Sequence, residues 1–82
     1  MNTPSVKLVI TEYRVRGRVG SSKVTDYEIF LNDVRLRGFS THGNMNEGYW
    51  GSEARKKGVD YAQAVAATLG VQVVRVRASK YF

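Results

Sequence analysis

Arginine recurs at every second position in three stretches of this chain. These arginines are Arg14, Arg16 and Arg18, then Arg35 and Arg37, and then Arg75 and Arg77. Because successive side chains of a β-strand point to opposite faces, each stretch predicts a strand that carries its arginines on one face. Apolar residues such as Val15, Leu36 and Val76 stand between the arginines and fall on the other face. The alternation therefore predicts a sheet with one apolar face and one exposed, arginine-rich face.

Four stretches predict β-strands because they are rich in β-branched residues and alternate in polarity. They are residues 6–19, 23–31, 34–40 and 71–78. Residues 20–22 and the dipeptide Asn32-Asp33 predict turns, so the first three strands form an antiparallel meander. Apolar residues fall on both faces in the first half of the first strand. That pattern indicates either a bulge near Thr11 or a segment covered on both sides.

One helix is predicted at residues 52–69, with Ser52 as its N-cap and Gly70 as its C-terminal stop. A helix packed on the apolar face gives an α+β domain of order β-β-β-α-β. Its sheet is four-stranded and mixed, mainly antiparallel, with one helix on one face. A right-handed crossover places the last strand beside the first, in spatial order 3-2-1-4, and the outer edge of the third strand is less favoured.

We expect residues 1–82 to form a single domain with a core shared by Ile29, Leu36, Val65 and Leu69. The chain has no cysteine, so neither a disulfide nor a thiolate metal site supports this core. No apolar run approaches the roughly 20 residues that cross a bilayer, and we expect no membrane contact. These features favour a cytoplasmic protein, in a bacterial or phage-infected cell.

The formal net charge of +6 and the pI near 10.0 predict an acidic partner, either nucleic acid or a protein surface. The predicted turns place Arg16 opposite Asp26. They also place Arg14 and Arg37 beside Glu28. One interpretation is a solvated charge ladder, in which each pair contributes roughly 0.2–1 kcal/mol. Four further arginines have no acidic neighbour in this register: Arg18, Arg35, Arg75 and Arg77. For these, contact with phosphate or guanine is the functional interpretation.

The start of the predicted helix is a second candidate site. Arg55, Lys56 and Lys57 lie in its first turns, where positive charge opposes the helix macrodipole. Tyr49 and Trp50 precede them between glycines. Together these residues predict an aromatic and basic site for a phosphate or a protein partner. The alternative is that Trp50 closes the end of the core while the cations are simply solvated.

Catalytic and metal-binding patterns are missing from the sequence. His42 is the single histidine, and the seven acidic residues have no metal-ligand spacing. Phosphate-binding glycine motifs and the nucleophile motif G-x-S-x-G do not occur. We therefore expect a non-enzymatic binding module that uses no metal and no cofactor.

The stretch YEIFLNDVRLRGFS, followed by an alanine-rich helix, resembles the plant ethylene-response-factor DNA-binding domain and the arm-binding domains of phage-type integrases. Those families read the major groove with a three-stranded sheet, so the resemblance implies DNA-contacting roles for Arg14, Arg16, Arg35 and Arg37. This chain departs from them in its longer loop before the helix, its lack of the plant domain's sheet tryptophans, and its additional last strand.

The closing stretch GVQVVRVRAS, after an alanine-rich helix, resembles small phage-encoded proteins that inhibit a host polymerase or a bacterial defence complex. We therefore expect a nucleic-acid-binding module first. The alternative is a phage-type inhibitor that docks on an acidic or nucleic-acid-binding surface of a polymerase or CRISPR-like complex. A basic structural or ribosome-associated protein is a third interpretation. An open edge, at the third or fourth strand, also predicts a possible homodimer.

Overall fold

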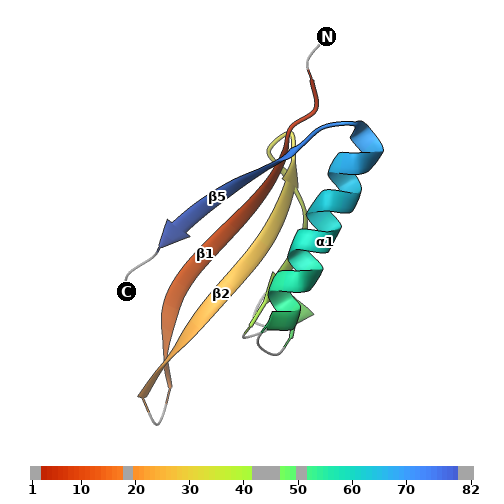
Figure 1. Cartoon of the computed structure of the whole chain (residues 1–82). Coiled ribbons are helices and arrows are strands. Elements are labelled where there is room, and N and C mark those ends of the chain that lie inside the picture. The colour runs from red at the N-terminus through yellow and green to blue at the C-terminus, as the bar shows by residue number, and fades with distance from the viewer. Residues whose placement is uncertain (1–2, 18–19, 42–46, 50–51, 80–82) are drawn as a thin grey trace.

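The protein is described by a computed structural model that covers residues 3–17, 20–41, 47–49 and 52–79. Its elements are β1 (Val6–Gly17), β2 (Gly20–Leu31), β3 (Val34–Ser40), β4 (Glu47–Gly48), α1 (Ser52–Leu69) and β5 (Val73–Ser79). The strands form one sheet in the order β4-β3-β2-β1-β5, with α1 on one face (Figure 1). The predicted α+β fold is confirmed. The strand order is also confirmed, since β5 pairs parallel to β1, and the short β4 adds to the outer edge of β3.

The second turn was predicted correctly and the first was not. Asn32 and Asp33 both have positive φ, at 51° and 68°, as a tight hairpin turn between β2 and β3 requires. In the first hairpin, Gly17 pairs with Gly20, so residues 18–19, which lie outside the described residues, join the strands. Because β2 begins at Gly20 instead of residue 23, every predicted cross-strand neighbour in this hairpin moves.

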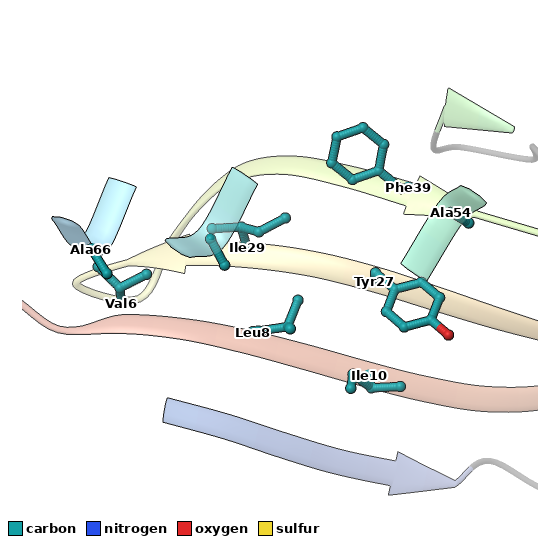
Figure 2. Close-up of a cluster of buried hydrophobic side chains, with 9 residues drawn as sticks. Val6, Leu8, Ile10, Tyr27, Ile29, Phe39, Ala54 and Ala66 are labelled. Atoms are coloured by element: carbon teal, nitrogen blue, oxygen red, sulfur yellow. The ribbon is translucent and has the colours of Figure 1, made fainter. Parts of the chain in front are cut away.

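The core lies between α1 and the face of the sheet that it covers, hereafter the helix-side face. Its buried apolar side chains are Val6, Leu8 and Ile10 of β1, Tyr27 and Ile29 of β2, Phe39 of β3, and Ala54, Ala62 and Ala66 of α1. The buried helix residues recur every four positions, with Gly58 continuing the row. Figure 2 shows Ala66 beside Val6 and Ala54 beside Tyr27, so α1 begins over the middle of the β1–β2 hairpin.

Two of the four predicted core residues are placed differently. Ile29 is fully buried and Val65 packs against the core, but Leu36 and Leu69 are each 39% exposed. Leu36 is the extra residue of a β-bulge in β3, because Ile29 pairs with Arg37 while Phe30 pairs with Arg35. Leu69 is the last helical residue and does not belong to the row that faces the sheet, in which buried residues recur every four positions from Ala54 to Ala66.

The β1–β2 hairpin is longer than the helix that covers it. Its pairing is continuous from Val6 to Gly17, so the bulge near Thr11, one of the two alternatives for this strand, is absent from these strands. Val9, on the other face, is half-buried, and no described helix covers that face. Figure 1 shows the hairpin continuing past the start of α1, in a molecule 51 Å long. We call this projection, residues 12–17 and 20–25, the basic arm.

Candidate nucleic-acid interface

The basic arm carries three exposed cations in one row. Arg14 and Arg16 follow Leu8 and Ile10 at the strand period, so they lie on the helix-side face but beyond the helix. Lys23 of β2 lies directly opposite Arg14. Like charges in directly opposed positions destabilise a sheet, so strand pairing does not explain this arrangement. The predicted partners Asp26 and Glu28 are wrong, because Arg16 pairs with Ser21.

The arginines of β5 lie on the same face as the cations of the arm. Arg75 pairs in register with Leu8, and Arg77 pairs with Ile10, which places both at the edge of the helix-side face. The carboxylate of Glu12 lies among these cations, with Oε2 at 3.3 Å from Lys23 Nζ and Oε1 at 3.9 Å from Arg77 Nη1. We define the helix-side basic surface as the exposed residues Arg14, Arg16, Lys23, Arg75 and Arg77.

The two arginines of β3 lie on opposite faces of the sheet, because the bulge at Leu36 separates them. Arg35 lies on the face without the helix, where its Nε donates to Glu28 Oε2 at 2.9 Å. The guanidinium carbon of Arg37 lies 4.9 Å from the Phe39 ring centroid and 5.5 Å from that of Tyr61, on the helix-side face. The prediction of one exposed arginine-rich face opposite the helix is therefore wrong. Most described arginines of the sheet lie on the helix-side face.

An aromatic and basic hollow of about 360 Å³ lies between β3 and α1. Its lining residues are Arg37, Phe39, Tyr49, Lys57, Asp60 and Tyr61. The Lys57 ammonium lies 4.8 Å from the Tyr49 ring centroid, and the Tyr49 ring lies 5.9 Å from that of Phe39. The sequence predicted Tyr49 and Lys57 as neighbours but missed Tyr61, although Tyr61 lies one helical turn after Lys57.

The remaining predicted site residues lie apart from this hollow or outside the described part of the chain. Arg55 and Lys56 are exposed in the first two turns of α1, next to the buried Ala54. An anion site at this helix start stays a prediction. Trp50 and Arg18 lie outside the described residues.

On the opposite face of the arm, the half-buried side chains of Tyr13 and Asp26 are joined by a hydrogen bond. The Tyr13 hydroxyl donates to the Asp26 carboxylate, beside Val24, which is 1% exposed. Burial raises the pKa of Tyr13 above its ordinary value, and the hydrogen bond to Asp26 and the charges of Asp26 and Glu28 raise it further. Asp26 Oδ1 is buried with no hydrogen-bond partner among the described residues. This packing supports the base of the arm.

Within the described ranges, no group of three His, Cys, Asp or Glu side chains could hold a metal ion. The same part of the chain contains no helix with the length and hydropathy to cross a membrane. No family model, curated protein or solved structure matches this chain.

Proposed function

We propose that this protein is a non-enzymatic DNA-binding module that places its basic arm in a groove of a duplex. The observation that carries the proposal is the two-stranded arm itself, which projects beyond α1 with Arg14, Arg16 and Lys23 in one exposed row. A row of cations at the tip of a narrow projection can enter a groove between phosphate chains, whereas a flat charged face can only lie across them.

The dimensions of the arm favour duplex DNA over double-stranded RNA. Paired strands lie about 4.8 Å apart, and the major groove of B-form DNA, about 12 Å wide, admits a two-stranded ribbon. The major groove of A-form RNA is deep and too narrow for side-chain reading. Binding to single strands usually depends on aromatic stacking, and the described residues of the arm's helix-side row are polar or charged.

Arg75 and Arg77 extend the contact from the groove to the phosphates beside it. They lie on the same face as the row of the arm, one and two strands away from its cations. Their planar guanidinium groups suit bidentate contact with phosphate oxygens. Glu12 holds Lys23 and Arg77 toward one another in the free protein, which keeps the basic surface continuous.

The inhibitor interpretation has less support from the geometry. A protein-binding hot spot uses a large aromatic side chain that fills a pocket on the partner. Tyr49, the described aromatic candidate, already packs on Phe39 and lies against Lys57, and its backbone N–H donates to the carbonyl of Ser40 at 2.9 Å.

Fluorescence anisotropy with a labelled DNA duplex, repeated over a salt series, tests the proposal. Two double variants remove the same charge from different places: Arg14→Gln/Arg16→Gln from the arm and Lys56→Gln/Lys57→Gln from the helix start. We expect the arm variant to bind at least tenfold more weakly. Its log–log salt slope should be shallower by about 1.8, or 0.9 for each lost phosphate contact. The helix variant should change both quantities less. No duplex binding at low salt, or equal losses in both variants, would overturn the proposal.

A further inference from the structure

Strand β5 forms one edge of the sheet, and no other strand of the described residues lies along its outer side. It pairs with β1 in one unbroken register from Val73 to Ser79. A strand has backbone N–H and C=O groups on both sides, so half of those in β5 point away from β1 and can pair with a further strand. Residues 74–78 are all exposed, and Figure 1 shows β5 on the side of the sheet away from α1.

The other edge of the sheet is less regular. The short β4 occupies part of it by pairing with Phe39 and Ser40 of β3. The bulge at Leu36 interrupts the regular pattern of the rest of β3. A bulge is one of the features with which proteins prevent unwanted pairing at a sheet edge, and proline is another. β5 contains neither, so it is the edge suited to accept a strand.

The side chains of β5 determine which strand this edge can accept. Arg75 and Arg77 lie on the helix-side face, and Val74 and Val76 lie on the other. Within the described ranges Arg75 has no ion-pair partner, and Arg77 lies 3.9 Å from a Glu12 carboxylate that is closer to a lysine. Opposite charges in directly opposed positions stabilise a pair of strands. A strand with carboxylates at alternate positions would therefore complement both arginines.

We propose that an extended acidic segment of a partner protein adds to the outer edge of β5 as a further strand. Its carboxylates would lie opposite Arg75 and Arg77, and its β-branched residues opposite Val74 and Val76. In strand addition, main-chain hydrogen bonds supply the affinity and alternate side chains supply the specificity. The two arginines also belong to the helix-side basic surface, so an acidic strand and a DNA duplex would compete for them.

A second copy of β5 is a poor occupant of this edge. An antiparallel pair of β5 strands centred on Val76 would place Arg75 of each copy opposite Arg77 of the other. A parallel pair in register would place each arginine opposite its own copy. Like charges directly opposite one another destabilise a sheet. The arginines therefore disfavour pairing between copies of this basic chain while they favour an acidic strand.

Two capped synthetic peptides of the same composition test the proposal in an NMR titration of nuclease-treated protein. One contains Val-Glu-Val-Glu-Val between threonines, a sequence that is the same in either direction, and the other contains Glu-Glu-Val-Val-Val. We expect the alternating peptide to bind about tenfold more tightly, because only it can place both glutamates opposite arginines on one face. Equal affinity of the two peptides would overturn the proposal.

Hydrogen exchange, measured residue by residue, shows whether the bound peptide is a strand of the sheet. We expect the alternating peptide to slow exchange at every second amide of β5, namely at those that do not pair with β1. Binding without this protection would overturn the proposal. The same amides are measured without peptide at a low and a high protein concentration, and we expect no change. Protection that rises with protein concentration would assign the edge to a second copy, and would also overturn it.

Two matched variants locate the contact. Arg75→Gln/Arg77→Gln removes two exposed cations from β5, and Arg55→Gln/Lys56→Gln removes two exposed cations from α1. We expect the β5 variant to bind the alternating peptide about tenfold more weakly and the α1 variant to remain within about twofold of the wild type. Equal losses would show that the peptide responds to total charge alone, and would overturn the proposal. These measurements use no DNA, so their outcome is independent of the DNA-binding proposal.

Discussion

Gly58 of α1 lies directly over Tyr27 of β2, with no space for a side chain between them. A Cβ atom added to Gly58 would lie 2.7 Å from the Cβ of Tyr27 and 3.7 Å from Cδ2 of Phe39. The helix therefore touches the sheet through its backbone at this point, six residues after it begins at Ser52. This contact helps to fix where α1 starts along the hairpin, and so how much of the hairpin projects as the basic arm.

We predict that Gly58→Ala destabilises the protein by about 1–3 kcal/mol, the usual cost of overpacking a core. In an exposed helix interior the same change would stabilise the fold by roughly 0.5–1 kcal/mol, because alanine is the better helix former. The sign of the effect therefore reports the contact with Tyr27. Urea unfolding followed by circular dichroism measures it.

A matched control lies on the exposed side of the same helix. Ala64 is exposed, so Ala64→Gly should cost about 1 kcal/mol from helix propensity alone. A Gly58→Ala variant more stable than the wild type would show that the helix can move away from Tyr27 without loss.

The elements of the fold could be predicted because their signals are local. Asn32 and Asp33 tolerate positive φ, and Gly70, with φ of 70°, ends the helix where its sequence position indicated. The helix bounds also follow from local features, a cap and a four-residue apolar spacing. The crossover rule, a general property of chains, then placed β5 beside β1.

The distribution of arginines between faces could not be predicted because it depends on tertiary features. The alternation predicts that Arg14 and Arg16 share one face of the sheet. That face is exposed at the arm only because α1 does not extend over it, which the alternation cannot predict. One bulged residue, Leu36, places Arg35 and Arg37 on opposite faces, and nothing in the alternation marks it. The first turn also lies two to three residues earlier in the chain than predicted, which changed the neighbours of Arg14.

The Tyr13–Asp26 hydrogen bond should contribute measurably to stability at neutral pH. Removing the hydroxyl takes one hydrogen bond from the Asp26 carboxylate, whose Oδ1 already has no partner among the described residues. We predict that Tyr13→Phe costs about 1–3 kcal/mol. The double variant Tyr13→Phe/Asp26→Val should recover part of that loss, because both polar partners are then absent. A Tyr13→Phe protein as stable as the wild type would contradict this role.

Tyr13 should also make stability depend on alkaline pH. Its pKa in the folded protein is raised above the ordinary value of 10.0, so the folded state holds the phenolic proton more tightly than the unfolded state. The contribution is fully present below pH 10.0 and is lost as the pH rises through the raised pKa. We predict that wild-type stability falls more steeply than that of Tyr13→Phe above this pH. Urea midpoints measured for both proteins across the alkaline range check the difference in slope.

Glu12 should weaken DNA binding even though it orders the basic surface. Its carboxylate lies between Lys23 and Arg77, so it offsets charge where the proposed phosphate contacts are made. Surface ion pairs of this kind contribute little to stability, typically about 0–1 kcal/mol. We therefore predict that Glu12→Gln leaves the melting temperature nearly unchanged and raises duplex affinity severalfold at low salt. Anisotropy titrations against the same duplex measure the change.

Asp60→Asn is the matched control for Glu12→Gln, because it removes one negative charge from the exposed side of α1, beside the aromatic hollow. Long-range attraction to DNA depends on total charge and is the same in the two variants, so any difference between them reports position. We expect Asp60→Asn to raise affinity less than Glu12→Gln, and the gap to narrow as salt screens both charges. If the two variants gain the same affinity for the duplex, binding depends on net charge alone and not on the position of the charge. If Asp60→Asn gains more, the DNA lies along the hollow between β3 and α1, and the arm is not the primary contact.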